Sequence, residues 1–191
     1  MISNKHVEQL IEAALFSSAK PLPVRILKEK LLLQYDVSTN HIKQSLADIE
    51  KHYQKRGVNL VEVASGFQFQ VKAEHNEDIA LLSEEKPQKY SRAILETMAL
   101  IAYKQPITRG EIEDIRGVAV SSHIIKTLIE RNWIKIVGYK EVPGKPSMYS
   151  TTKEFLDYFS LKSLEQLPEL LPMEESSIAN SVMQDIMPSN E

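Results

Sequence analysis

The sequence predicts a mainly α-helical fold with small β-wings, arranged as two tandem winged-helix domains. Two observations lead to this prediction. Residues 91–150 show the order helix, turn, helix, turn, helix and then a two-stranded hairpin, which is the order of elements in a winged helix. A similar order of apolar stripes and breaks occurs about 85 residues earlier in the chain.

The first helix of the later copy is predicted over Ser91–Tyr103, because apolar residues recur there at helical spacing without Gly or Pro. These residues are Ile94, Leu95, Met98, Ala99, Ile101 and Ala102. Gln105-Pro106 is expected to end the helix, since proline lacks a backbone N–H and disfavours helical geometry in the residue before it.

The second helix of this copy is predicted to start at Thr108, because Glu111 follows at the spacing of a capping box. Ile112 and Ile115 are expected to form its buried edge. Gly117 supplies the flexible position at which a helix ends.

A third helix and a hairpin complete the copy. Ser121 or Ser122 is expected to cap the helix and Asn132 to end it. Its apolar face would hold Ile124, Ile125, Leu128 and Ile129. Trp133–Val137 is rich in strand-forming residues, and the turn residues Gly138, Pro143-Gly144 and Lys145-Pro146 precede a second strand at Met148-Tyr149.

The earlier copy starts with a helix at His6–Ser18 and a proline break at Lys20–Pro23. Placing Pro21 on Pro106 aligns apolar positions throughout: Leu10 with Leu95, Ala14 with Ala99, Leu15 with Leu100, Leu22 with Ile107, and Leu27 with Ile112. A second helix at Val24–Leu33 and a third at Asn40–Arg56, capped by Ser38 or Thr39, are expected to follow.

The third helix of the earlier copy is expected to bury Ile42, Leu46, Ile49 and Tyr53 and to end at Gly57. The alternating segments Val58–Val63 and Phe67–Lys72, on either side of Ser65-Gly66, predict a β-hairpin. Two similar amphipathic copies could also arise by chance, but the shared order of breaks favours a duplicated fold.

The remaining segments set the domain boundaries. Glu74–Lys89 is polar around the apolar patch Ile79–Leu82 and indicates a linker, whereas the chain beyond Pro172 is acidic and indicates disorder from about Met173. We therefore divide the chain into an N-terminal winged helix at 1–75, a linker at 76–90, a C-terminal winged helix at 91–170 and an acidic, disordered tail at 171–191.

Two short elements are expected between the second wing and the tail. Lys153–Ser160 is predicted as a helix that uses Phe155, Tyr158 and Phe159 for packing. Ser163–Leu167 is predicted as one further helical turn, which Pro168 ends.

The composition limits the function classes. The chain of 191 residues has no cysteine, which excludes disulfides, thiolate zinc sites and cysteine nucleophiles and suits a cytoplasmic protein. No apolar run is long enough for a transmembrane helix, and the N-terminus lacks the apolar core of a signal peptide. The net charge of −3 is far from that of a dedicated polyanion binder.

We find no motif for catalysis, a cofactor or a metal. No glycine-rich phosphate loop and no GxSxG elbow occurs, and the five histidines follow no metal-binding spacing and are expected to be solvated. The acidic cluster Glu111, Glu113 and Asp114 lies in a first helical turn and is expected to face solvent. The sequence therefore predicts a non-enzymatic protein.

The alternative function is that of a winged-helix DNA-binding transcriptional regulator, because a winged helix commonly places its third helix in the major groove. That helix offers His123, Lys126 and Arg131, and the wing offers Lys135, Lys140 and Lys145. So few cations predict weak, salt-sensitive binding. A protein partner is favoured, since apolar stripes on helices of mixed charge can accept a partner helix.

Six stretches of the C-terminal half resemble one known family, segregation and condensation protein B. They are YKQPITRGEIEDIRGV at Tyr103–Val118, LIER at Leu128–Arg131, VG at Val137-Gly138, EVPGKP at Glu141–Pro146, YSTT at Tyr149–Thr152 and FLDYFSLKSL at Phe155–Leu164. The resemblance in layout covers residues 5–170, and it is specific over 91–170.

The resemblance implies a non-enzymatic subunit of the bacterial condensin-like complex. Members of this family are expected to form homodimers, mainly through the N-terminal domain, and to bind the kleisin segregation and condensation protein A. The kleisin in turn bridges the heads of the structural-maintenance-of-chromosomes ATPase, so the chain would be cytoplasmic, nucleoid-associated and only indirectly or weakly bound to DNA.

Our hypothesis for the kleisin-binding surface is the first two helices of the C-terminal domain and the segment between them. Its named residues are Tyr103, Ile107, Arg109 and Ile112. Periodicity by itself does not separate residues of the core from residues of an interface.

Overall fold

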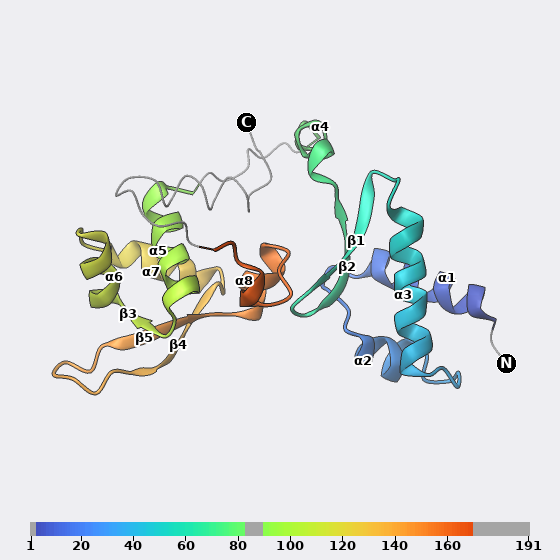
Figure 1. Cartoon of the computed structure of the whole chain (residues 1–191), viewed down its shortest axis with the longest axis horizontal. Coiled ribbons are helices and arrows are strands. Elements are labelled where there is room, and N and C mark those ends of the chain that lie inside the picture. Colours follow the sequence, from blue (N-terminus) through green and yellow to red (C-terminus); the bar gives the residue numbers. More distant parts are fainter. Residues whose placement is uncertain (1–2, 83–89, 170–191) are drawn as a thin grey trace.

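The computed structural model describes residues 3–82 and 90–169, and each of these ranges contains a winged helix (Figure 1). The predicted fold class is therefore confirmed. The predicted disordered tail at 171–191 and the part of the predicted linker at 83–89 lie outside the described residues.

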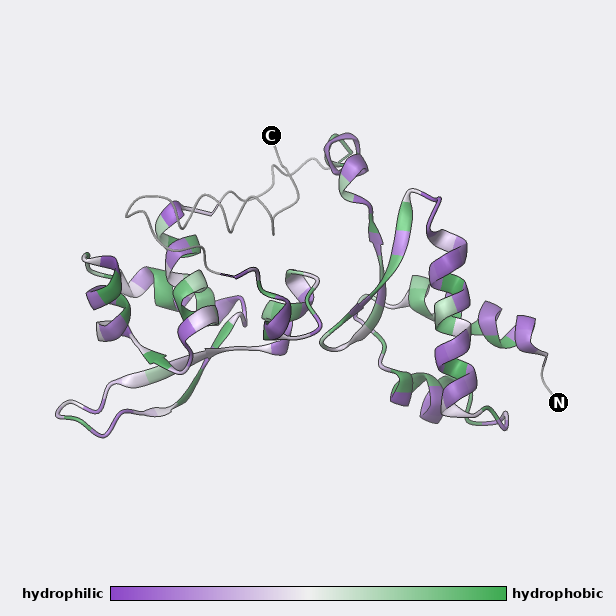
Figure 2. Ribbon diagram, viewed as in Figure 1, coloured by the Kyte–Doolittle hydropathy of each residue, from purple (hydrophilic) through white to green (hydrophobic). Residues whose placement is uncertain are grey.

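The N-terminal domain contains three helical segments and a hairpin. They are α1 (Asn4–Ser17), α2 (Val24–Ile26) with its continuation η1 (Leu27–Leu31), α3 (Thr39–Tyr53), β1 (Val58–Val63) and β2 (Gly66–Val71). Figure 2 shows hydrophilic and hydrophobic residues alternating along α1 and α3, as expected for helices with one buried face. Its core lies between α1, α3 and the hairpin and is built from Val7, Ile11, Leu15, Leu27, Leu32, Val37, Ile42, Leu46, Ile49, Tyr53 and Leu60.

The second helical segment differs from its prediction. Instead of one α-helix over Val24–Leu33, the chain widens into a π-helix at Leu27–Leu31, where the Leu32 N–H donates to the Leu27 carbonyl oxygen at 2.9 Å. Two residues five apart point about 140° away from each other in an α-helix. The wider turn brings Leu27 and Leu32 toward the same side, and both are buried.

The third helix and the hairpin form as predicted, but α3 ends at Tyr53 rather than Arg56, and the turn lies one residue before the predicted Ser65-Gly66. The Ser38 hydroxyl accepts the His41 backbone N–H at 3.2 Å and so caps α3. The four residues predicted to face inward, Ile42, Leu46, Ile49 and Tyr53, are all buried. Strands β1 and β2 pair antiparallel from Val58↔Val71 to Val63↔Gly66, which leaves Ala64-Ser65 as the two-residue turn.

The C-terminal domain repeats this order with an additional short strand. Its elements are α5 (Arg92–Lys104), β3 (Ile107–Thr108), α6 (Arg109–Arg116), α7 (Ser122–Glu130), β4 (Ile134–Tyr139) and β5 (Ser147–Thr151), followed by α8 (Lys153–Tyr158) and η3 (Leu164–Gln166). The wing is the antiparallel hairpin β4–β5, and β3 pairs with β5, giving the strand order β3-β5-β4. The core of this domain is formed by residues of α5, α6 and α7 together with residues of the sheet and of the segment around α8. It contains Met98, Ile101, Ala102, Ile107, Ile112, Val120, Ile124, Ile125, Leu128, Trp133, Ile134, Phe155, Phe159 and Leu161.

The two copies share a topology that extends beyond the predicted helices. Leu22 forms an antiparallel bridge with Phe67 of β2, and the aligned residue Ile107 pairs with Tyr149 of β5. The alignment of Pro21 with Pro106 does not hold for the first helix of each copy, where each residue of the earlier helix corresponds to a residue one position later in α5. The buried pair Ile11 and Leu15 corresponds to the buried pair Thr97 and Ile101, so the second copy has one residue fewer between its first helix and its strand.

Two predicted core residues lie on the surface. Ile115 is 46% exposed and Ile129 is also exposed, whereas their neighbours Ile112 and Leu128 are buried. Helix α6 ends at Arg116, and the next residue, Gly117, adopts the left-handed conformation with φ 69°. The chain therefore turns away before another element covers Ile115.

Part of the predicted linker is helical. Ala73–His75 forms a 3₁₀ turn, η2, and Asn76–Ala80 forms the short helix α4. The apolar residues Ile79, Leu81 and Leu82 at this point are exposed. Figure 1 shows α4 projecting from the far end of β2.

Candidate functional site

The corner formed by α5, β3 and α6 contains the residues predicted to bind a partner. Tyr103 is half-buried near the end of α5, and its hydroxyl donates to the Pro168 carbonyl oxygen at 2.7 Å. Burial raises the pKa of the Tyr103 hydroxyl. Arg109 opens α6 and donates from Nε to Glu113 at 2.9 Å and from Nη1 to the Ser122 hydroxyl at 3.0 Å.

The other two residues of the hypothesis lie in the core. Ile107 is 3% exposed and Ile112 is 0% exposed, so neither side chain can contact a partner directly in this structure. Ile107 is buried because β3 is paired with β5 and lies over the domain core. The structure therefore corrects the hypothesis for these two residues, which support the surface from beneath.

Gln105 stabilises the connection between α5 and β3 through side-chain hydrogen bonds, a role that the sequence did not predict. Its Nε2 donates to the Ala102 carbonyl oxygen at 3.0 Å, which continues the end of α5. Its Oε1 accepts the Thr151 backbone N–H at 2.8 Å and the hydroxyls of Thr151 and Ser150. One amide therefore joins the end of α5 to the last strand of the wing; a polar residue directly before the proline was the only local signal.

The predicted capping box of α6 is present, and its glutamate also binds a lysine of the wing. Thr108 donates from its backbone N–H at 2.8 Å and from its hydroxyl at 2.7 Å to Glu111 Oε2 and accepts the Glu111 N–H at 3.3 Å. Lys140, at the end of β4, donates to Glu111 Oε1 at 2.6 Å. The hydrogen bond from Lys140 and those from Thr108 lower the pKa of Glu111 from an ordinary value of 4.5 to about 2.

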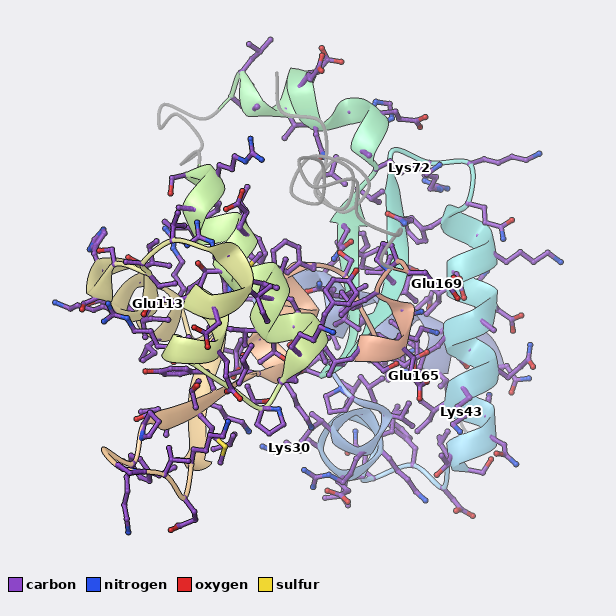
Figure 3. All side chains as sticks on the ribbon, turned by 60° about the vertical axis from the view of Figure 1, so that its left-hand side comes forward. Lys30, Lys43, Lys72, Glu113, Glu165 and Glu169 are labelled. Atoms are coloured by element: carbon purple, nitrogen blue, oxygen red, sulfur yellow. The ribbon has the colours of Figure 1, made fainter. Side chains whose placement is uncertain are left out.

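Glu113 connects α6 to the loop before α7. Its Oε1 accepts both the Val120 backbone N–H at 2.8 Å and the Arg109 guanidinium at 2.9 Å. The Val120 hydrogen bond, followed by that from Arg109, lowers the pKa of Glu113. Glu113, labelled on α6 in Figure 3, and Glu111 are thus engaged in structural contacts rather than simply solvated as the sequence predicted.

Arg116 connects α6 to α5. Its side chain is 9% exposed and donates to Glu96 Oε2 from Nη2 at 2.9 Å, with Arg92 on the other carboxylate oxygen at 2.7 Å. Desolvation raises the pKa of Glu96, but the hydrogen bonds from Arg92 and Arg116 outweigh it, and the net shift is downward. Helix α6 is therefore tied to α5, to the loop before α7 and to the wing, which makes this corner a rigid platform.

Exposed apolar side chains occur at the edge of this platform and on the N-terminal domain. Ile115 and Val118 flank the end of α6. On the N-terminal domain, Phe16 is 54% exposed and stacks on Phe69 with ring centroids 4.1 Å apart, beside the ring of Tyr53. Exposed aromatic and apolar residues of this kind are enriched at protein–protein contacts.

The basic residues considered for DNA binding are largely engaged within the protein. Lys126 is exposed and lies 3.6 Å from Glu130 on the same helix, and Lys140 binds Glu111. The Arg131 guanidinium lies over the rings of Tyr90 at 4.7 Å and Trp133 at 5.5 Å. These contacts leave Lys135 and Lys145 as exposed cations of the wing.

The described residues contain no group of three or more His, Cys, Asp or Glu side chains placed to hold a metal ion. One histidine differs from its prediction, since Nε2 of His41 is buried without a hydrogen-bond partner. Over the ranges 3–82 and 90–169, every helix is too short or too polar to cross a membrane.

A profile of the family described as segregation and condensation complex subunit ScpB matches residues 9–170, which include most of both winged helices. The chain belongs to the ScpB family. The segregation and condensation protein B homolog of Coxiella burnetii is 54% identical over 161 residues, covering 84% of this chain and 77% of that protein. Segregation and condensation protein B of Syntrophotalea carbinolica is 43% identical over 166 residues, covering 86% and 82%.

Two solved structures are similar to this ScpB family member at low TM-scores. ScpB from Mycobacterium tuberculosis is 25% identical, with a TM-score of 0.38 and coverage of 84% of this chain and 99% of that one. A crystal structure described as a dimer of ScpB N-terminal domain complexed with ScpA peptide is 19% identical, with a TM-score of 0.36 and coverage of 46% and 100%. At these scores the two structures add no support to the fold, which follows from the order of its own elements.

Proposed function

We propose that this chain is a non-catalytic subunit of a bacterial condensin-like complex. In this role it pairs with a second copy, binds the kleisin segregation and condensation protein A and so supports bridging of the chromosome-maintenance ATPase heads on the nucleoid. The observation that carries the proposal is the family match over residues 9–170, because it spans both domains rather than one common helical motif.

The proposed surface for self-association lies on the N-terminal domain. The stacked rings of Phe16 and Phe69, with Tyr53 beside them, present aromatic area next to charged residues such as Glu12 and Arg56. An exposed aromatic centre within a polar rim is typical of a protein interface.

The proposed surface for the kleisin is the corner of α5, β3 and α6. Its backbone is held by Gln105, Glu111, Glu113 and Arg116, so little conformational freedom is lost when a partner binds. The surface residues of this proposal are Tyr103, Arg109, Ile115 and Val118. An amphipathic helix could place its apolar face on Ile115 and Val118.

The experiment measures kleisin affinity by calorimetry and copy number by light scattering after size exclusion. We expect Val118→Ser with Ile115→Ser to weaken kleisin binding at least about tenfold without changing the copy number. We expect Phe16→Ser to shift the protein from two copies to one. Leu33→Ser, at an exposed apolar residue that belongs to neither proposed surface, serves as the matched control.

These outcomes separate the two surfaces. Undiminished kleisin binding by the folded double variant would place the kleisin interface elsewhere, and a chain that ignores the kleisin altogether would contradict the function. Nanomolar binding to one particular duplex, lost with Lys126→Glu and Lys135→Glu in gel shifts over a salt series, would support the DNA-binding regulator instead.

A further inference from the structure

The tip of the β1–β2 hairpin lies against the segment that follows α8 in the other domain (Figure 1). The turn residues Ala64 and Ser65 each donate a backbone N–H across this contact. Ala64 donates to the Leu161 carbonyl oxygen at 2.9 Å, and Ser65 donates to Asp157 Oδ1 at 2.9 Å. Such donors at a hairpin tip ordinarily bind water, so two direct partners from one other domain indicate a specific contact.

Two further contacts flank the tip, one on each strand. Lys162 Nζ lies 2.6 Å from Glu62 Oε2 of β1, and the Ser160 hydroxyl donates to Gln70 Oε1 of β2 at 3.0 Å. We call these contacts the joint. Its residues are Glu62, Ala64, Ser65 and Gln70 on the hairpin and Asp157, Ser160, Leu161 and Lys162 on the segment after α8.

The hairpin side of the joint is held in place by its own domain. Leu22 and Phe67 exchange backbone hydrogen bonds at 2.9 and 3.0 Å, so the segment at Leu22 lies beside β2 as a third, one-residue strand. Gly66 has φ +140°, and a Cβ on it would lie 2.4 Å from the Leu22 carbonyl carbon and the Pro23 nitrogen. The turn therefore presents its two N–H groups from a rigid base.

The acceptor side is equally fixed by the C-terminal domain. Ser160 adopts φ 58°, and the Leu161 N–H donates to the Leu156 carbonyl oxygen at 2.8 Å. The Lys162 N–H donates to Gln166 Oε1 at 2.6 Å. Because the Leu161 side chain is buried in the C-terminal core, its carbonyl oxygen is positioned by that core.

We propose that the joint is an intramolecular latch that holds the two winged helices in one relative orientation and opens as a unit. Each group in it is polar, and each can exchange its partner for water when the domains separate, so opening and closing are reversible. The Glu62–Lys162 pair is about half exposed, and salt therefore weakens the closed state. A partner that touches both domains would select one of the two states. The latch does not depend on the proposed function.

A zero-length carbodiimide crosslink tests the latch in the full chain, since it joins a carboxylate to an amine only when they touch. The pair Lys140–Glu111 lies within the C-terminal domain at the same 2.6 Å and with similar exposure, so its crosslink is the internal reference. We expect the Lys162–Glu62 crosslink at a yield comparable to the reference, with both partners from one molecule when labelled and unlabelled chains are mixed. Its absence beside a normal reference crosslink, or its formation only between molecules, would overturn the proposal.

A matched pair of variants on α8 tests which groups hold the latch. Asp157→Ala removes the acceptor for Ser65, and we expect it to lower the Lys162–Glu62 crosslink severalfold relative to the reference. Glu154→Ala removes an exposed carboxylate of the same helix and should leave the ratio unchanged. An unchanged ratio in Asp157→Ala would show that the turn does not hold the domains together.

Discussion

At the residue scale, single side chains fix the backbone of the C-terminal domain. Gln105, Glu111 and Glu113 each bind groups from two separate segments of the chain. All three lie in Tyr103–Val118, the motif that carries the family resemblance. The polar residues of this motif thus hold neighbouring segments of the backbone together, and for Glu111 and Glu113 the carboxylate charge contributes to that role.

Glu111 makes the stability of the C-terminal domain depend on pH. Its pKa is lowered from 4.5 to about 2 in the folded state, so its contribution is present above pH 4.5 and is lost as the pH falls toward 2. We expect Glu111→Gln to lower the unfolding free energy at pH 7 by roughly 1 kcal/mol, a value reduced for solvent screening at this partly exposed group. Denaturant unfolding should show a smaller difference at pH 3.

Glu165→Gln is the control for this prediction, because Glu165 is an exposed acid without a hydrogen bond or ion pair in the described structure. It should leave the unfolding free energy unchanged at both pH values. A Glu111→Gln difference that is equal at pH 7 and pH 3 would contradict a contribution from the carboxylate charge.

At the element scale, α6 and the hairpin depend on contacts with neighbouring segments. Helix α6 is short, and an ion pair holds each of its ends: Glu111 binds the wing, and Arg116 binds α5. The β1–β2 hairpin is fastened by its bridge to Leu22. An isolated short helix or two-stranded hairpin is marginal in water, so these attachments decide whether the elements form.

Arg116 and Arg92 bind the same carboxylate, Glu96, from environments of different exposure, which makes them a matched pair. Arg116→Met removes the buried partner and leaves Glu96 partly uncompensated, so we expect a loss of about 3 kcal/mol in unfolding free energy. Arg92→Met removes an exposed helical pair and should cost roughly 0.5 kcal/mol. Equal effects of the two variants would show that burial of Arg116 is energetically unimportant.

Gly66 and Gly110 form a second matched pair. Gly66→Ala would place a Cβ 2.4 Å from backbone atoms of Leu22 and Pro23 at φ +140°, so we expect a loss of roughly 3 kcal/mol or more. Gly110 lies in α6 with nothing within 4 Å of a built Cβ, and Gly110→Ala should be neutral or stabilising by up to about 1 kcal/mol. Thermal unfolding followed by circular dichroism distinguishes the two; a harmless Gly66→Ala would contradict the close approach at Leu22.

At the scale of the whole molecule, the described residues form two separate hydrophobic cores linked by the joint. In the part of the chain that the structure describes, neither core contains a side chain of the other domain, so each core is complete within its own domain. The two domains should therefore unfold with only weak coupling, and the single tryptophan, Trp133, lies in the C-terminal core.

This arrangement predicts that different probes report different transitions. Leu46→Ala empties part of the N-terminal core and should shift the circular dichroism transition while leaving the Trp133 fluorescence midpoint unchanged. Leu128→Ala should shift the fluorescence midpoint, with a loss of about 2–5 kcal/mol in either case. Identical shifts of both probes in both variants would indicate one cooperative unit and contradict weak coupling.

Local sequence patterns determined the caps of this protein and the approximate positions of most of its helices and strands, but not the π-helix at Leu27–Leu31. The capping box of Thr108 and Glu111 and the left-handed end at Gly117 lie where the sequence places them. The hairpin turn, Ala64-Ser65, lies one residue before the predicted Ser65-Gly66. Caps and turns are decided by residues within about four positions of each other, so one segment contains all the information. The duplication and both wings followed from repetition of these local signals.

Only the tertiary structure decided which apolar faces are covered and which segments touch. Periodicity assigned Ile112 and Ile115 to one buried helix edge, but the end of α6 leaves Ile115 exposed. Ile107, which was expected at the partner surface, is buried by the pairing of β3 with β5. Of the predicted partner surface, Tyr103 and Arg109 remain accessible, and their role is still a prediction. The contact of Ser65 with Asp157 joins residues 92 positions apart, and no local pattern encodes a contact that forms only when two completed domains meet.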